Sequence, residues 1–280
     1  MPEGDTIFRA ARTLHQALAG RTVARFESVL PQLTRVDEDA PLAGRRVERV
    51  WSQGKHLLME FSGDLVLRTH MRMNGSWHVY RPGERWQRPR RDMRIVIETD
   101  AFVAVAFTVP VAEFSSGKAA ARGLRPLGPD LLATDFDESE AASRLREAVS
   151  MSLGDALIDQ RLVAGAGNVY KSEVCFLCGL DPFVRIGELS DDQIAAVVRT
   201  ARRVMLANTA PSSGGGIVTY HGLRRTTGRA NPAERLWVYG RRGRPCRRCG
   251  APVRSRKQGP DARTTYWCPV CQPSQVESER

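Results

Sequence analysis

The first residues of the chain, Met1-Pro2-Glu3-Gly4-Asp5-Thr6, could carry out covalent chemistry. Met1 is expected to be removed before a residue as small as proline, which leaves Pro2 with a free secondary amine. Such an amine attacks an aldehyde-like carbon and forms an iminium, and the adjacent Glu3 could transfer protons. Apolar residues at spacings of four, three and four predict a helix directly afterwards: Ile7, Ala11, Leu14 and Leu18. The alternative is that Pro2 only opens this helix, with Glu3 and Asp5 as acids of its first turn.

Four cysteines near the C-terminus have the spacing of a metal site. They form two Cys-x2-Cys pairs separated by eighteen residues: Cys246, Cys249, Cys268 and Cys271. Four thiolates on two short turns can close a tetrahedron around Zn²⁺. We therefore expect one structural zinc ion, in a module too small to hold a core of its own. A third pair, Cys175 and Cys178, lies in an apolar segment and is interpreted as buried thiols.

A glycine-containing turn at residues 159–168 could bind a phosphate. It ends at Asn168, which could cap the helix expected at 169–178 while the neighbouring backbone amides point at a docked anion. An ordinary helix–turn–helix packing unit explains the same pattern equally well.

Composition and charge favour a globular protein with a polyanionic partner. The 280 residues, 42% hydrophobic and 26% charged, suit two domains or one domain with a small module. A net charge of +11 and a pI of about 10.0 indicate nucleic acid first and an anionic membrane second. Nine Arg or Lys residues cluster at 241–263 beside one acid, Asp261, so we expect a phosphate-binding face there. The longest apolar run, 101–107, is too short to span a bilayer, and no export is expected.

The segments that must position these residues change character along the chain. Short apolar segments between Val47 and about Phe114 predict a β-sandwich or barrel, with strands at 56–61, 65–69, 76–80, 94–99 and 101–107. Residues 127–130, Leu-Gly-Pro-Asp, are expected to interrupt regular secondary structure. After them the apolar residues recur with the period of a helix, and helices are expected at 141–149, 153–158, 169–178 and 190–207. Ser190 and Gln193 predict a capping box. Residues 211–235 are expected to form an exposed loop, flexible at 211–216.

Taken in order, these motifs resemble the formamidopyrimidine-DNA glycosylase and endonuclease VIII family. The match consists of Pro2-Glu3-Gly4, Gln53-Gly54-Lys55, His70-Met71-Arg72-Met73-Asn74-Gly75, the run from Asp159 through Asn168 to Val174, and the four cysteines. It covers nearly the whole chain and is most like the bacterial endonuclease VIII type. The resemblance implies an α+β multidomain fold. Its parts would be an N-terminal helix on a β-sandwich (1–132), a helix–two-turn–helix DNA-binding domain with a flexible loop (133–235), a zinc-finger β-hairpin (236–273) and a tail (274–280).

The resemblance also implies roles for single residues. Pro2 would attack C1′ of the damaged nucleotide, Glu3 would act as acid and base, and Lys55 would complete the catalytic set by contacting the phosphate beside the lesion. Three other positions match phosphate-contacting residues of the family: His70, Asn168 and Arg263. Met73 matches the apolar residue that fills the space of the extruded base, with a turn-side core methionine as the alternative.

The chain departs from the family branch that removes purine lesions. That branch carries an Arg-Arg-Phe-Gly-like loop, whereas this chain has residues 107–113 there, without either arginine. We therefore expect a bifunctional DNA glycosylase and AP lyase that removes oxidised pyrimidines by β,δ-elimination in base-excision repair. Its partner would be damaged duplex DNA, and also single-stranded or bubble DNA.

Two alternatives stay open. One is a glycosylase for purine lesions such as 8-oxoguanine or formamidopyrimidine, and the other is a non-catalytic, zinc-dependent DNA-binding protein. In each case we expect a bacterial, cytoplasmic, nucleoid-associated monomer without membrane contact.

Overall fold

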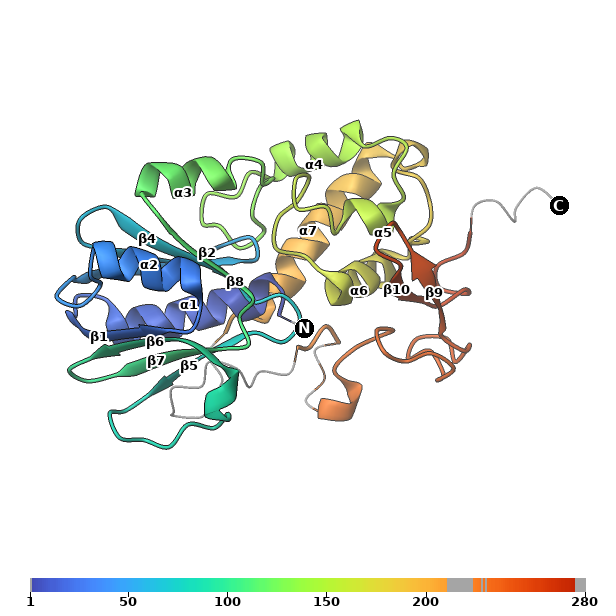
Figure 1. The fold of residues 1–280 in the computed structure, drawn as a ribbon. Helices are drawn as coiled ribbons and strands as arrows, with labels where there is room; N and C mark the ends of the chain where they lie inside the picture. The colour runs from blue at the N-terminus through green and yellow to red at the C-terminus, as the bar shows by residue number, and fades with distance from the viewer. Residues whose placement is uncertain (1, 211–223, 228, 230, 275–280) are drawn as a thin grey trace. The chain divides into compact units, whose positions relative to one another are not determined.

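The computed structural model describes residues 2–210, 224–227, 229 and 231–274 (Figure 1). It contains two compact units, one up to Pro126 and one comprising Leu127–Ala210 and the described residues beyond Leu223. Met1, most of the loop expected at 211–235 and all but the first residue of the tail expected at 274–280 lie outside the described residues. Within the described ranges, no helix has the length and apolar character needed to cross a membrane.

The first unit is a sandwich of two four-stranded antiparallel sheets, as expected. The strand orders are β2-β3-β4-β8 and β1-β6-β7-β5. The strands are β1 (Val23–Ser28), β2 (Val47–Gln53), β3 (His56–Phe61), β4 (Leu65–His70), β5 (Ser76–Tyr80), β6 (Met93–Thr99), β7 (Val103–Phe107) and β8 (Val111–Ser115). The bounds of β3 and β5 are those predicted, and the other three predicted strands differ from the observed ones by one or two residues.

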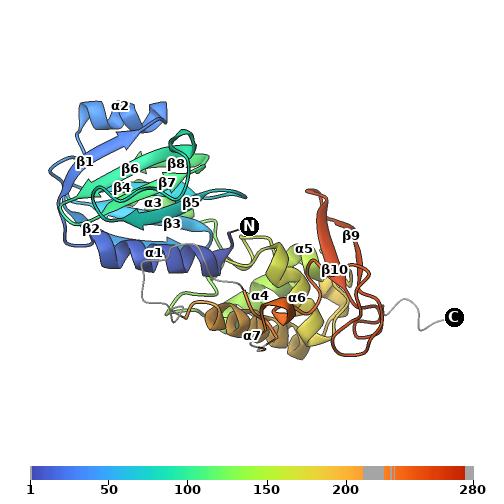
Figure 2. The ribbon, with the colours of Figure 1, turned by 90° about the horizontal axis from the view of Figure 1, so that it is seen from below.

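Two helices close the open sides of this sandwich. α1 (Gly4–Leu18) contacts the edge strands β2 and β5, and α2 (Pro31–Asp39) contacts the opposite edge strands β1 and β8. Figure 2 shows the two helices on opposite sides of the strands. The predicted apolar stripe of α1 is buried as expected, and Leu14 and Leu18 are 0% exposed. Near the end of α1, Nδ1 of His15 accepts a hydrogen bond from the N–H of Val50 in β2 at 3.1 Å.

A second apolar layer covers the outer face of the sheet that contains β5 and β7. Tyr80 and Phe107 pack there with Trp86, which lies in the connection between β5 and β6. This connection ends in a 3₁₀ turn, η1 (Arg90–Asp92). Because both faces of β5 and β7 are covered, every residue of these two strands is buried. A short helix, α3 (Gly117–Leu124), follows β8.

The second unit combines helices with one antiparallel hairpin. Its elements are α4 (Glu138–Glu147), α5 (Leu153–Ala156), α6 (Asn168–Cys178), η2 (Ile186–Glu188), α7 (Asp191–Ala207), η3 (Pro232–Glu234), β9 (Arg254–Gln258) and β10 (Arg263–Trp267). The predicted capping box is confirmed, since Ser190 and Gln193 bond to each other's backbone N–H. α4 begins three residues earlier than expected, because the Asp137 side chain accepts the N–H of Glu140.

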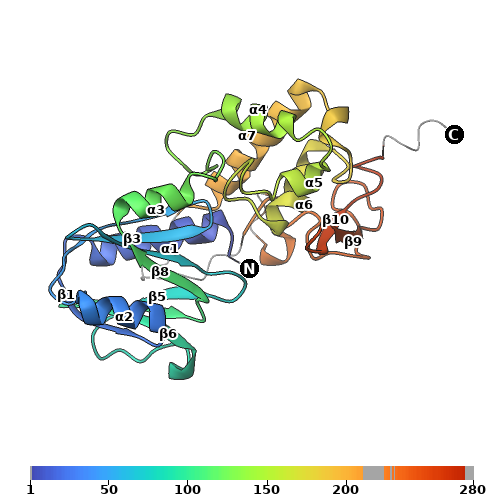
Figure 3. The same cartoon turned by 45° about the horizontal axis from the view of Figure 1, so that its top comes forward.

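The hairpin lies beside α6 (Figure 3). The N–H of Tyr266 in β10 donates to Oγ of Ser172 at 3.2 Å. The fully buried carboxylate of Glu173 accepts the three successive N–H groups of residues 237–239, each at 2.9 Å. The chain that leads into the hairpin is therefore attached to the same helix that begins at Asn168.

Candidate functional site

Pro2 and Glu3 lie directly before the first helix. Glu3 is the N-cap residue of α1, and its carbonyl accepts the N–H of Thr6 at 2.9 Å and of Ile7 at 3.1 Å. The Glu3 side chain makes no capping bond and is fully buried. Pro2 is also buried and precedes the N-cap, so it does not occupy the first helical position that the helix-opening interpretation requires. The nitrogen of Pro2 thus lies one residue from a buried carboxyl group, at the positive end of α1.

Lys55, His56 and His70 come together at one end of β3 and β4. The two imidazoles are in edge-to-face contact, and Nδ1 of His70 accepts the N–H of Arg72 at 3.0 Å. Burial, followed by the positive charges of Arg72 and Lys55, lowers the pKa of His70 to about 4. Burial also lowers the pKa of His56 to about 4. At neutral pH, His70 is therefore uncharged and carries its proton on Nε2, as a hydrogen-bond donor near a lysine.

Met73 is exposed on the turn that follows β4. Its exposed fraction is 61%, whereas that of Met71, two residues earlier, is 1%. Met71 is therefore the core methionine of this turn, and the core interpretation of Met73 is wrong. Its neighbours Arg72 and Asn74 are exposed as well, and Arg72 has a positive φ of 50°.

Asn168 and Arg263 lie close together in the second unit. Gly167 is the N-cap of α6 and Asn168 is its first residue, so the capping role considered for Asn168 is wrong. Instead, Nδ2 of Asn168 donates to the carbonyl oxygen of Thr264, the neighbour of Arg263, at 2.8 Å. Oδ1 of the same amide is buried and has no hydrogen-bond partner among the described residues. This contact joins the start of α6 to the start of β10.

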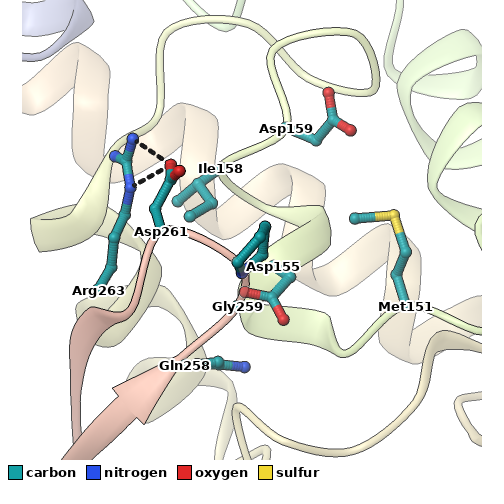
Figure 4. Close-up of a pocket in the computed structure, with 9 residues that line it drawn as sticks. Met151, Asp155, Ile158, Asp159, Gln258, Gly259, Asp261 and Arg263 are labelled. Atoms are coloured by element: carbon teal, nitrogen blue, oxygen red, sulfur yellow. Dashed lines mark hydrogen bonds and ion pairs between the residues drawn. The ribbon is translucent and has the colours of Figure 1, made fainter.

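The guanidinium of Arg263 is bound by a carboxylate that the sequence did not single out for this role. Its Nε and Nη2 donate to Oδ2 of Asp261 at 3.1 and 3.0 Å, as Figure 4 shows. Both residues line a pocket together with Met151, Asp155, Ile158, Asp159, Gln258, Gly259 and Pro260. Hydrogen bonds from Arg161 lower the pKa of Asp159. Three carboxylates thus face the same pocket as the arginine expected to bind phosphate.

The four cysteines form a cluster that can bind a metal ion. The Sγ atoms of Cys246, Cys249, Cys268 and Cys271 lie within 4.8 Å of one another. The Sγ–Sγ distances are 3.9 Å for Cys246 and Cys271 and 3.4 Å for Cys249 and Cys268. Tetrahedral coordination with metal–sulfur bonds of ~2.3 Å gives edges of about 3.8 Å, so the sulfurs fit such a site.

The remaining Cys-x2-Cys pair lies on α6, outside this cluster. Cys175 is fully buried, as expected, and Cys178 is half-buried. Burial raises the pKa of both thiols, which keeps them protonated and unreactive.

Several basic residues of the 241–263 segment have partners inside the second unit. Arg241 and Arg247 each donate to two backbone carbonyls. Arg248 and Arg256 cover aromatic rings on and just after α6, with Cζ 4.6 and 3.4 Å from the ring centroids. These four guanidiniums hold the hairpin region together, a role that the charge pattern did not predict. The exposed basic residues of the segment are Arg242, Arg244, Arg248, Arg254, Arg256 and Lys257.

Comparison with known proteins identifies the family. Two family models match: the formamidopyrimidine-DNA glycosylase N-terminal domain over residues 1–110 and the H2TH domain of that glycosylase over residues 127–220. The "probable endonuclease 8 2" of Streptomyces coelicolor is 43% identical over 275 residues, which cover 97% of this chain and 94% of the relative. The "DNA-(apurinic or apyrimidinic site) lyase Nei2" of Mycolicibacterium smegmatis is 38% identical over 97% of this chain and 99% of its own length.

A solved structure supports the same assignment at the level of the fold. It is a complex of Lactococcus lactis Fpg with abasic-site DNA, and it matches with a TM-score of 0.81 at 23% identity, over 98% of this chain and 100% of that chain. The resemblance drawn from the ordered motifs is thereby confirmed, and the chain belongs to the formamidopyrimidine-DNA glycosylase family.

Proposed function

We propose that this protein is a bifunctional DNA glycosylase and AP lyase that removes oxidised pyrimidines in base-excision repair. The observation that carries the proposal is the position of Pro2 and a buried Glu3 directly before α1, in a member of this glycosylase family. A protein that only binds DNA has no need of a nucleophilic amine beside a carboxyl group.

The reaction begins when the secondary amine of Pro2, freed by removal of Met1, attacks C1′ of the damaged nucleotide. The bond between C1′ and the base breaks, and Glu3 moves protons as the sugar ring opens to an iminium. The cationic nitrogen acidifies the hydrogens on C2′, and loss of one as a proton expels the 3′ oxygen of the strand. A second elimination releases the phosphate on the 5′ side, and water then hydrolyses the adduct to free Pro2.

DNA phosphates would bind in both units. In the first, Lys55 supplies a cation and His70 a neutral N–H donor. In the second, Asn168 and Arg263 occupy adjacent positions on α6 and β10. Phosphate contacts on both sides of the lesion hold the strand while the nucleotide is extruded, which costs a few kcal/mol.

Met73 would fill the space that the extruded nucleotide leaves, since it is exposed on its turn. The connection between β7 and β8 consists of residues 108–110, and its Val109 is fully buried, so it offers no comparable aliphatic side chain for insertion. We therefore expect activity on single-stranded and bubble DNA as well as on duplex DNA. Cleavage of one lesion in duplex and single-stranded oligonucleotides tests this expectation, and a strict duplex requirement would contradict it. A preference for 8-oxoguanine over 5-hydroxyuracil and thymine glycol would contradict the oxidised-pyrimidine assignment.

Zinc is the metal that we assign to the cysteine cluster, because an all-sulfur tetrahedral donor set is typical of structural zinc. Four protein ligands close the site, so the ion would stabilise the hairpin and take no part in the reaction. We assign catalysis to residues 1–132, DNA binding to 133–235 and the metal-bound finger to 236–273. We expect the protein to act on chromosomal DNA in the bacterial cytoplasm, with the nucleoid, as a monomer.

Borohydride trapping on abasic-site DNA tests the proposed chemistry. Borohydride reduces the iminium to a stable amine. Protein from which Met1 has been removed should therefore form a covalent adduct with the DNA, and mass spectrometry should locate that adduct at Pro2. Pro2→Thr should abolish the adduct while its affinity for DNA with a reduced abasic site stays within about two-fold of wild type, a difference of ~0.4 kcal/mol. If wild-type protein that has lost Met1 yields no adduct, the enzymatic proposal is wrong and the non-catalytic DNA-binding alternative remains.

A further inference from the structure

The turn that carries Met73 is held firmly at its β4 end. The N–H of Gly75 donates to the carbonyl oxygen of Met71 at 2.9 Å and closes the turn. A Cβ on Gly75 would lie 2.5 Å from that oxygen, so no other residue fits without moving the backbone. The N–H of Arg72 is bound by Nδ1 of His70 at 3.0 Å. Met73 therefore projects from a turn whose backbone bonds are largely made within residues 70–75.

Arg88, which lies further along the chain, also binds this turn. It lies in the connection between β5 and β6, and its Nη1 is 3.4 Å from the carbonyl oxygen of Asn74 and 3.3 Å from Oγ of Ser76. Its Nη2 lies 3.5 Å from a carboxylate oxygen of Asp92, and its Cζ lies 6.0 Å from the ring centroid of Phe107. The guanidinium thus links the turn to the apolar layer on the outer face of the sheet.

A chain of hydrogen bonds continues this link along the outer face of β5. The N–H of Gln87 donates to Oη of Tyr80 at 3.0 Å, and that hydroxyl lies 3.2 Å from Nδ1 of His78. Nε2 of His78 lies 3.0 Å from Oγ of Ser76, the atom that also accepts from Arg88. All bonds are satisfied when Tyr80 donates to Nδ1 and neutral His78 donates from Nε2. The β5–β6 connection is therefore tied to the turn by two routes that meet at Ser76.

We propose that Arg88 is a positioning residue for Met73, holding its turn in place while a nucleotide is extruded from the DNA. This inference rests on the proposed function of Met73. An extruded base tends to restack, so a side chain that takes its place must stay in position against that tendency. Val109 in the β7–β8 connection is fully buried, so the proposal assigns the inserted role to Met73 and makes the rigidity of its turn important.

Arg88→Met is the variant that tests the proposal, because methionine keeps an unbranched apolar stem but removes the donors. Arg90→Met is the matched control. Arg90 belongs to the same connection and lies 3.1 Å from Glu27 and 5.7 Å from the Trp86 ring centroid, and neither contact involves the turn. Arg88→Lys, which keeps one cationic donor, should restore part of any loss and guards against a variant that fails to fold.

Excision of one lesion is measured in duplex and in single-stranded DNA. We expect Arg88→Met to lower kcat/KM about five-fold on duplex DNA, in line with the loss of one hydrogen bond. It should change kcat/KM less than two-fold on single strands, which have no stack to fill. Arg88→Met combined with Met73→Ala should be no worse than Met73→Ala alone, since contacts that act through one group are not additive. Additive losses, equal losses on both substrates or an equal loss in Arg90→Met would overturn the proposal.

The ¹³C-methyl resonance of Met73 separates failure of this inference from failure of the proposed function. In Arg88→Met the resonance should shift and change in width in the free protein, whereas Arg90→Met should leave it unchanged. An unchanged resonance in Arg88→Met would overturn the role of Arg88 alone. If Met73→Ala left duplex excision unchanged, the space-filling role of Met73 would be wrong whatever the resonance shows.

Discussion

The imidazole rings of His56 and His70 meet edge to face, with their centroids 5.1 Å apart. The pKa of each is lowered to about 4, first by burial and then by nearby positive charge. In the unfolded chain each ring titrates near pH 6.5. Between pH 6.5 and 4 the unfolded chain thus binds more protons than the folded one, and stability falls as the pH falls through this window.

Calorimetry at pH 7 and pH 5 checks this consequence. We expect the unfolding midpoint of the first unit to fall by roughly 5 °C, since 1 kcal/mol shifts the midpoint of such a domain by ~4 °C and partial exposure weakens the effect. His56→Phe keeps an aromatic ring against His70 and should reduce the decrease. If the unfolding midpoint fell equally in wild type and His56→Phe between pH 7 and pH 5, the pH dependence would come from groups other than His56.

Removing one ligand from the cysteine cluster should release the metal. Cys268→Ser is expected to lose zinc, as measured by mass spectrometry of metal content, and to bind DNA roughly ten-fold more weakly, or ~1.4 kcal/mol, because the hairpin loses its metal crosslink. Cys178→Ser is the matched control, since Cys178 lies on α6 outside the cluster. A metal-free Cys268→Ser protein with unchanged DNA affinity would contradict the role assigned to the finger.

Arg263 and Asn168 should differ in their effect on the salt dependence of DNA binding. Arg263→Gln removes a phosphate-binding cation and should reduce the slope of log affinity against log salt by ~0.9. Asn168→Ala removes a neutral donor and should weaken binding with little change in slope. Arg199→Gln, which breaks an ion pair with Glu138 on another surface of the second unit, controls for the loss of one charge. Equal slopes in all three variants would argue against a phosphate contact at Arg263.

Asp261 should restrain DNA binding, because it occupies the Nε and Nη2 edge of Arg263. That edge can bind a phosphate through two parallel hydrogen bonds, so a phosphate that docks there must displace the carboxylate. Asp261→Asn is expected to raise affinity about three-fold, measured by fluorescence anisotropy, a modest effect typical of an exposed ion pair. Glu138→Gln frees Arg199 in the same way and should have a smaller effect. If both variants raised DNA affinity equally, the gain in Asp261→Asn would be explained by the change in net charge and not by release of Arg263.

The elements that carry the site could be predicted where their apolar residues recur at regular helical or strand spacing. The stripe of α1 and the bounds of β3 and β5 are examples. β1, α2 and α3 were missed because each buries little. Leu33 is the one buried residue of α2, and β1 is an edge strand whose Arg25 pairs with Glu98 of β6 at 2.9 Å. Polar edge elements lack the periodicity on which such predictions depend.

The site residues followed from the family motifs, but their partners did not. Asn168 bonds to a carbonyl 96 residues away, and a Cβ on Gly259 would lie 2.4 Å from Oδ1 of Asp155. Such contacts depend on how distant segments pack, which no local spacing encodes. Asp261 appeared in the sequence as a lone acid in a basic segment, and its role became visible only beside Arg263.

The arginines that hold the hairpin region have a consequence for redesign of this protein. Arg241 spans the carbonyls of Trp237 and Pro245, and Arg247 those of Leu236 and Ala233. A planar guanidinium can bridge two acceptors in this way, whereas a lysine ammonium is a single point of charge on a flexible stem. Exchanging these arginines for lysines would preserve the net charge of +11 and yet loosen the segment. Base composition of the genome could account for a general excess of arginine over lysine. At positions 241 and 247, arginine is in addition needed to bridge two backbone carbonyls.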